Sequence, residues 1–287
     1  ALPPAEQEKY RSLLEQARSY ASNLQSDDET AALIKSLDGR FTSPGTGGDS
    51  IRDPEITTGK NMYAFEAAKI PSNSAWEAAE AALDKLLALY RDQNNGETPV
   101  KMAFSLWSSD AIRTLGGMEA QVIHALGLQP VWHANGVLSH FDIIPASQLK
   151  RPRIDAVIQV TGTYRDQFDS FIRKLSEAIE RLAQLEEPDN PVRSNTLSIY
   201  QKLLQQGMNQ EEAMIYASSR VFGNEPGQYG TGLTHRVLQN SSWEHETELA
   251  GQFLDTQGYI FSHRLWGQKA SSKQPVFTMQ LENTQAA

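Results

Sequence analysis

The spacing of apolar residues predicts several amphipathic helices along this chain. Residues 4–23 place Tyr10, Leu13, Leu14, Ala17 and Tyr20 three or four positions apart, as on one face of a helix. Helical spacing returns over 74–91, and further helices are predicted from about residue 117 and over 167–185, 193–206, 209–219 and 245–256. Residues 38–72 are instead crowded with Gly, Pro, Asp and Thr, which predicts a long loop that is either functional or a linker.

Short apolar runs between the helices predict strands. They cover residues 100–107, 128–132, 137–144 and 153–162, and the turn signal HANG separates the second run from the third. Helices that alternate with apolar strands favour an α/β fold, with a mainly parallel sheet flanked by helices and with additional helical segments at both ends. We expect three parts: N-terminal helices and a Gly/Pro-rich loop (1–72), an α/β domain (73–190) and a mainly helical region (191–287).

Composition narrows the classes of function. A net charge of −9 argues against nonspecific binding to nucleic acid, which requires a basic surface. The chain has no cysteine, which excludes thiolate chemistry and Cys-ligated zinc. No apolar run reaches the length of about 18 residues that a membrane span needs, and the first residues do not resemble a signal peptide. We therefore expect a cytoplasmic protein without a membrane span.

Polar side chains follow two of the predicted strands. Trp107, Asp110 and Arg113 come after the first strand, and Tyr164, Arg165 and Asp166 come after the last. Ligand sites of parallel sheets lie beyond the carboxyl ends of the strands, so these residues predict a polar cleft. The arginines suit substrate carboxylates, and the aromatic rings suit a flat macrocycle. A network of Arg–Asp pairs that only closes the sheet edge explains the same residues, and Glu119 is either a base or an ordinary surface glutamate.

Other motifs give weaker signals. The six histidines have no compact ligand spacing, so no metal site is predicted. Glu244 and Glu246 around His245 offer donor atoms, although the SSWEHE cluster is more typical of a helix start, with Ser242 near the N-cap. SPGTGGDS and ITTGKN contain glycine but lack the Walker pattern. If ATP is used, another chain hydrolyses it.

Several stretches, read in order, resemble the large subunit of class II ATP-dependent chelatases, the CobN type of cobaltochelatase and the H subunit of magnesium chelatase. The first is LDGRFTSPGTGGDSIRDPEITTGKNMYAFEAAKIPS at 37–72. FSLWSSDAIRTLGGMEAQVIHALGLQPVW, IIPASQLKRPRIDAVIQVTGTYRDQF, NPVR, RVFGNEPGQYGTGL and NSSWEHETELAGQFLDTQGYIF follow. The likeness spans about residues 37–280. Ser50 after GGD and the reading TGTYRD are small departures from the family pattern.

The resemblance implies a fragment, from the C-terminal half, of a tetrapyrrole-binding subunit. Such a subunit holds the macrocycle while a divalent metal, cobalt or magnesium, is inserted, and separate AAA+ partner subunits hydrolyse ATP. Cobalt and a corrin-type ring are favoured because FGNEPGQYGTGL is closer to the CobN branch, and the isolated fragment is expected to be inactive. A noncatalytic tetrapyrrole-binding or AAA+ docking module, a magnesium- or iron-specific relative, and an unrelated α/β sugar- or nucleotide-binding enzyme remain alternatives.

The family pattern also points to site residues, with Gly47 and Gly48 shaping the long loop. The expected catalytic carboxylates are Glu119, Asp166 and Glu244. The expected substrate-binding residues are Arg40, Asp49, Lys60, Trp107, Arg113, Tyr164, Arg165 and Tyr229. Replacing Arg165 by Ala is expected to weaken binding of a carboxylated macrocycle without unfolding the chain.

Overall fold

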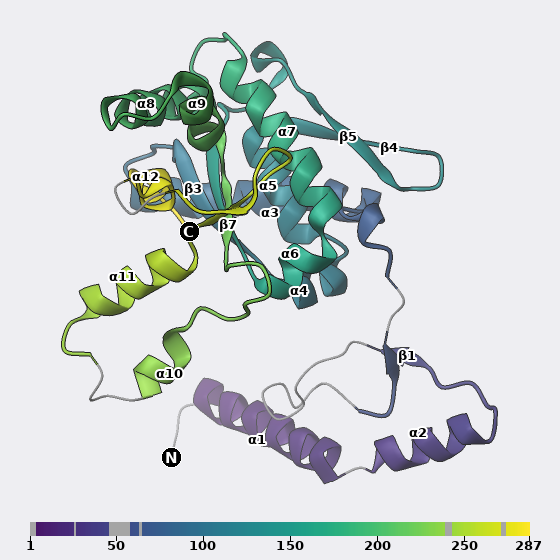
Figure 1. Ribbon diagram of the computed structural model, residues 1–287. Coiled ribbons are helices and arrows are strands. Elements are labelled where there is room, and N and C mark those ends of the chain that lie inside the picture. The colour runs from purple at the N-terminus through teal and green to yellow at the C-terminus, as the bar shows by residue number, and fades with distance from the viewer. Residues whose placement is uncertain (1–3, 26, 46–57, 63–64, 239–242, 271–273) are drawn as a thin grey trace. The chain divides into compact units, whose positions relative to one another are not determined.

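The computed structural model describes residues 4–25, 27–45, 58–62, 65–238, 243–270 and 274–287, which fall into two units, 1–65 and 66–287. In the first unit, helix α1 (Pro4–Gln25) and helix α2 (Asp28–Leu37) precede two short strands, β1 (Pro44–Gly45) and β2 (Asn61–Met62), that pair in parallel (Figure 1). Asp27 caps α2 by accepting a hydrogen bond from the Thr30 N–H. The helix expected at 4–23 is confirmed, and the described parts of 38–62 form little regular structure.

A five-stranded sheet forms the centre of the second unit. Its order is β3 (Lys101–Leu106), β6 (Asp155–Val160), β7 (Val221–Gly223), β8 (Tyr259–Phe261) and β9 (Trp266–Gln268). The first three strands run parallel, and β8 and β9 add to β7 as antiparallel strands. The long apolar strands predicted at 100–107 and 153–162 are therefore neighbours, and the expected α/β fold is confirmed.

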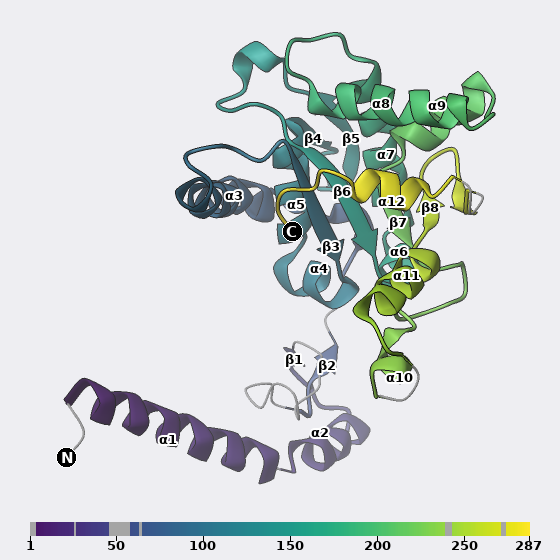
Figure 2. The same cartoon turned by 90° about the vertical axis from the view of Figure 1, so that its left-hand side faces the viewer.

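Helices cover both faces of this sheet. The bounds are α3 (Asn73–Gln93), α4 (Ser108–Thr114), α5 (Gly117–Leu126), α6 (Gly162–Gln167), α7 (Asp169–Gln184), α8 (Pro191–Gln205), α9 (Gln210–Ser218), α10 (Leu233–Leu238), α11 (Glu246–Thr256) and α12 (Val276–Leu281), with short turns η1 (Ala67–Lys69) and η2 (Ala146–Gln148). Figure 2 shows α3 and α5 on one side of the strands and α12 on the other. Val157 packs with Leu203, Phe222 and Phe277 in a core that joins the sheet to α8, α9 and α12.

Three features differ from the sequence prediction. Strands β4 (Leu128–Trp132) and β5 (Leu138–Ile143) form an antiparallel hairpin that is separate from the main sheet. The short turn between them, where Gly136 takes a φ of +81°, lets the two strands pair with each other. The helix predicted at 167–185 is confirmed as α7, but a short helix that the sequence did not predict, α6, precedes it and meets it at Phe168. One sheet takes strands from both sides of residue 190, so the segments expected as an α/β domain and a helical region form one compact unit.

Among the described residues, no helix combines the length and the apolar character that a membrane crossing demands.

Candidate functional site

The carboxyl ends of β3 and β6 lie side by side. Because the strands are parallel and in register from Lys101–Asp155 to Leu106–Val160, the residues that follow them meet at one edge of the sheet. The Thr161 N–H donates to the Leu106 carbonyl over 3.2 Å. The Ser108 hydroxyl donates to the Gln167 side chain, and this bond joins α4, which follows β3, to α6, which follows β6. We call this region the carboxyl-edge site. It contains Trp107, Asp110, Arg113, Glu119, Tyr164, Arg165, Asp166 and Tyr229.

The turn between α4 and α5 places Glu119 in the interior. Leu115 and Gly116 have φ angles of +55° and +91°. A Cβ on Gly116 would lie 2.6 Å from Ile70 Cγ2, so this position accepts only glycine. The chain therefore makes a tight turn between α4 and α5. Glu119 lies in the first turn of α5, which packs against the sheet, and its side chain is only 1% exposed.

Glu119 and Tyr164 form a buried polar pair. Glu119 Oε2 and Tyr164 Oη have no hydrogen-bond partner among the described residues, yet the two groups are close enough to shift each other's pKa. Burial raises the pKa of Glu119 to about 7, which outweighs a smaller lowering by its own backbone N–H, and burial raises the pKa of Tyr164 well above its usual value. At neutral pH this carboxyl is therefore poised between its two protonation states. Its enclosure keeps it away from a ligand at the surface.

Arg165 anchors the glycine-rich segment, residues 222–232. Its guanidinium donates to the Asn224 and Glu225 carbonyls at 3.1 and 2.9 Å and binds both oxygens of Asp166 at 2.7 and 3.1 Å. The side chain is 2% exposed, so its donors are engaged inside the protein. We therefore expect Arg165→Ala to destabilise the fold as well as to affect binding, because the change leaves the Asn224 and Glu225 carbonyls without donors.

Asp166 and Tyr229 carry the same network to the surface. Tyr229 is 63% exposed, and its hydroxyl donates to Asp166 Oδ2 over 2.7 Å. Hydrogen bonds from Arg165 and then from Tyr229 lower the pKa of Asp166, which keeps this 43% exposed carboxylate ionised at neutral pH. The site thus presents a fixed negative charge beside an aromatic ring.

Close packing explains a glycine in TGTYRD. A Cβ on Gly162 would lie 2.6 Å from the Gln228 carbonyl and 2.7 Å from Tyr229 Cδ1. The absence of a side chain at the start of α6 lets the glycine-rich segment lie directly on that helix. This contact sets the position of Tyr229.

Trp107 and Arg113 are exposed residues that follow β3 at this edge. Trp107 is 56% exposed, and the Arg113 side chain is 63% exposed and pairs with Asp110 at 2.5 Å. An exposed indole and a surface guanidinium at one edge offer a stacking face and a carboxylate-binding group. These two predicted residues therefore have the exposure that ligand binding needs.

A row of neutral polar groups crosses the sheet behind Trp107. The indole N–H donates to Ser105 Oγ at 3.1 Å, Ser105 to Gln159 at 2.7 Å, and Gln159 to Gln257 at 2.9 Å. Sequence reasoning did not identify Ser105, Gln159 or Gln257, because 98 residues separate the two glutamines. In the sequence, Ser105 is a polar residue between Phe104 and Leu106 in an apolar run, which is the signal that could have identified it.

The remaining predicted residues lie elsewhere. Arg40 is exposed and pairs with Asp38 at 2.7 Å, and Lys60 is exposed; both belong to the 1–65 unit. Asp49, Gly47 and Gly48 fall outside the described residues.

Glu244 is exposed at the start of α11, where its N–H and that of His245 donate to Glu248 at 3.3 Å. The helix-start interpretation of this cluster therefore holds, with His245 as the N-cap; Ser242 lies outside the described residues.

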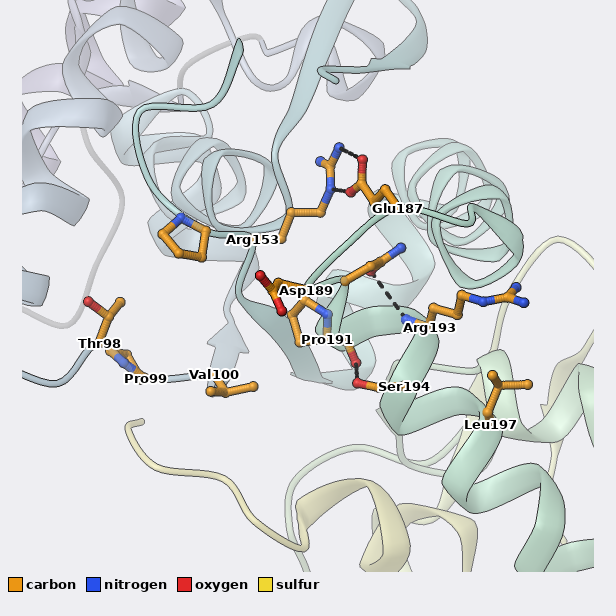
Figure 3. Close-up of a pocket in the computed structure, with 12 residues that line it drawn as sticks. Thr98, Pro99, Val100, Arg153, Glu187, Asp189, Pro191, Arg193, Ser194 and Leu197 are labelled. Carbon is orange, nitrogen blue, oxygen red and sulfur yellow. Dashed lines mark hydrogen bonds and ion pairs between the residues drawn. The ribbon is translucent and has the colours of Figure 1, made fainter. Parts of the chain in front are cut away.

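A hollow of about 580 Å³ lies at the opposite, amino ends of β3 and β6 (Figure 3). Its cations are already paired: Arg153 binds Glu187 and backbone carbonyls, and Arg193 binds Glu186 at 2.7 Å. Asn190 caps α8 there and holds the end of α7 through the Leu182 carbonyl at 2.8 Å. The polar groups at this end fasten helices together.

The described residues contain no group of three or more His, Asp or Glu side chains arranged to hold a metal ion.

Comparison with known proteins decides the family. A family model described as CobN/Magnesium Chelatase matches residues 2–287. The chain belongs to the CobN/Magnesium Chelatase family. The aerobic cobaltochelatase subunit CobN of Pseudomonas aeruginosa is 32% identical over 263 residues, covering 90% of this chain and 21% of that protein. The magnesium-chelatase subunit ChlH of rice, named as chloroplastic, is 31% identical over 98% of this chain and 20% of its own length.

A solved structure agrees with the family assignment. The catalytic subunit of cobaltochelatase from Mycobacterium tuberculosis superimposes with a TM-score of 0.74 at 32% identity, over 89% of this chain and 21% of that one. The chain thus spans about a fifth of the length of these relatives. Family members of both the cobalt and the magnesium type match it at similar identity, so the metal is open.

Proposed function

We propose that this chain is a segment of the tetrapyrrole-binding large subunit of an ATP-dependent metal chelatase. The supporting observation is the carboxyl-edge site in a member of the CobN/Magnesium Chelatase family. Exposed Trp107 and Tyr229 offer flat apolar rings to a macrocycle, and Arg113 offers a cation to its carboxylates. Asp166 supplies a negative charge in the same place.

In this proposal Asp166 accepts protons from the ring. Inner N–H protons have to leave before a divalent metal is bound by the macrocycle nitrogens, so a positioned base helps. Asp166 is 43% exposed, and its lowered pKa keeps it ionised at neutral pH, which makes it a weak base that passes an accepted proton on to water. Arg165 and Tyr229 hold both of its oxygens in place.

Glu119 has a different role from the one its pKa first suggests. A pKa of about 7 suits a base, but the carboxyl is enclosed and borders Tyr164 instead of the surface. We assign it as a positioning residue that supports Tyr164 beneath Arg165 and Asp166. Glu244, at the start of α11, retains only the helix-starting role that its surroundings support.

The metal and the partners are further parts of the proposal. We propose cobalt and a corrin-type macrocycle, supported by the resemblance of FGNEPGQYGTGL to the CobN branch. ATP hydrolysis belongs to AAA+ partner subunits, since the sequence has no Walker motif. The cytoplasmic location stays a prediction, because the rice relative is named as chloroplastic.

Metal insertion by a chimeric subunit tests this function. In the CobN chimera, residues 1–287 replace the matching segment of the Pseudomonas aeruginosa subunit, and insertion is followed with partner subunits, ATP and either Co²⁺ or Mg²⁺. We expect Co²⁺ insertion, and a loss of about 100-fold on Asp166→Asn. The control Asp142→Asn, another exposed carboxylate, is expected to leave the rate unchanged.

Each other outcome has a defined meaning. Insertion of Mg²⁺ alone contradicts the choice of cobalt. A folded chimera that binds macrocycle but inserts neither metal, beside an active parent subunit, identifies a noncatalytic module. A full rate in Asp166→Asn removes that carboxylate from the chemistry.

A further inference from the structure

Strand β3 lies at an edge of the five-stranded sheet, with β6 on one side. The Leu106 carbonyl accepts from Thr161, and the Val100 carbonyl accepts from Asp155. The even-numbered residues of β3 therefore direct their backbone groups to β6. The N–H and C=O groups of Lys101, Ala103 and Ser105 point away from the sheet.

The first part of this outer edge is already paired. The Gln285 N–H donates to the Lys101 carbonyl at 3.0 Å, and the Ala103 N–H donates to the Ala286 carbonyl at 2.8 Å. These bonds form a parallel bridge between Met102 and Ala286. The Gln285 side chain adds a bond from the Val100 N–H at 2.5 Å. The outer edge of β3 can therefore pair with another backbone segment, and the segment already paired there, at Gln285 and Ala286, runs parallel to β3.

The second part of the edge is open. Within the described part of the chain, the Ala103 carbonyl and the Ser105 N–H have no hydrogen-bond partner, and Ser105 is exposed. Unpaired donors and acceptors in a row are the usual template for adding a strand. They lie directly before Trp107, so any strand placed there ends at the carboxyl-edge site.

We propose that a segment of the large subunit outside residues 1–287 adds to β3 as a sixth strand. The inference rests on the proposed function, in which this chain is one part of a longer subunit. Relatives about five times as long supply the length, and the bridge at Ala286 supplies direction and register. The strand bonds the Ala103 carbonyl and the Ser105 N–H, and its end contributes residues beside Trp107.

The geometry disfavours a second copy of this chain as the occupant. Gln285 and Ala286 cover the start of the edge, which leaves too short a stretch for two β3 strands to pair with each other. A strand that continues the existing bridge meets no such obstacle.

Amide hydrogen exchange tests the proposal. In this chain alone, we expect the Ser105 amide to exchange freely, while the Phe104 amide, which faces β6, exchanges slowly and serves as the control. In the CobN chimera, the Ser105 amide is expected to slow by about 100-fold or more. Fast exchange in the folded chimera contradicts the proposal. Protection that grows with the concentration of the chain alone identifies a second copy and also contradicts it.

Two proline variants give an independent readout. Ser105→Pro removes the open donor and also the hydroxyl that bonds Trp107 and Gln159, so Ser105→Ala, which removes only the hydroxyl, is its matched control. Relative to that control, Ser105→Pro is expected to lower the thermal midpoint of the chimera but not of the chain. Ala103→Pro removes the donor to Ala286 and is expected to lower both. If Ser105→Pro unfolds the chain itself, the exchange measurement still decides. Exchange and melting do not depend on metal insertion, so failure of the sixth strand and failure of the chelatase proposal are distinguishable.

Discussion

Burial separates the charged residues of the carboxyl-edge site into two groups. Arg165 and Glu119 are enclosed and act on other residues, whereas Asp166 and Arg113 reach the surface. Arg165 and Asp166 are adjacent in the sequence, yet they have opposite environments. A charged residue in a motif therefore has to be assigned from its surroundings, and its exposure decides whether it is available to a ligand.

Replacing Arg165 tests this distinction. Arg165→Ala is expected to lower the free energy of unfolding by about 3–5 kcal/mol, because the carbonyls of Asn224 and Glu225 lose their donor inside the protein. Arg113→Ala, at an exposed arginine with one ion pair, is expected to cost less than about 1 kcal/mol. Urea unfolding followed by circular dichroism measures both, and equal small losses contradict the anchoring role of Arg165.

Glu119 predicts a pH dependence of stability. Its pKa is about 7 in the folded chain and near 4.5 when unfolded, so the folded state binds the proton more tightly. The stabilisation that protonated Glu119 contributes to the free energy of unfolding is therefore fully present below pH 4.5. It is lost as the pH rises towards 7 and the folded chain gives up this proton. The full loss is about 3 kcal/mol at most.

Glu119→Gln supplies the matched control, since it keeps the shape but cannot ionise. Between pH 4.5 and 7, the parent chain is expected to lose stability relative to this variant in urea unfolding. Parallel curves for the two proteins are incompatible with a buried, titrating Glu119.

At the scale of elements, the glycine-rich segment depends on the surface of α6. Gly162→Ala places a methyl group against the Gln228 carbonyl and is expected to cost about 1–3 kcal/mol and to displace Tyr229. Gly251→Ala, in α11 with no atom near the new Cβ, is expected to be neutral or stabilising by up to about 1 kcal/mol. Thermal unfolding of both variants measures the contrast, and similar midpoints are evidence against the close contact.

Sequence pattern predicted the long elements and missed the short ones. Strands β3 and β6 are six residues each, and most of their positions are buried, so their apolar runs are readable. Strands β7, β8 and β9 have three residues each, too few to show a period, and their place depends on contacts made across the fold.

The same limit applies to the site. The position of polar residues after β3 and β6 was predictable, because parallel strands bring their carboxyl ends together. The burial of Glu119 and Arg165 and the contact of Gln159 with Gln257 depend on distant segments. No local pattern in the sequence specifies them.

At the scale of the whole molecule, the apolar core lies in one unit. Among the described residues, the buried apolar side chains run from Ile70 to Met279, and none belongs to residues 1–65. Residues 66–287 alone are therefore expected to unfold cooperatively, with a midpoint within about 3 °C of the full chain. Differential scanning calorimetry of both chains measures this, and loss of the transition in the shorter chain contradicts an independent unit.

The central claim is that the carboxyl-edge site binds a tetrapyrrole, and its most direct test is a titration of this chain with a corrinoid precursor and, separately, with protoporphyrin, followed by tryptophan fluorescence. We expect saturable binding to one macrocycle with a Kd of about micromolar. Trp107→Phe is expected to remove most of the quenching, and Arg113→Ala to raise the Kd about tenfold. Lys150→Ala, which removes an exposed cation paired with Glu80, is expected to change neither. Absence of binding to both macrocycles, or equal quenching and affinity in all variants, contradicts the claim.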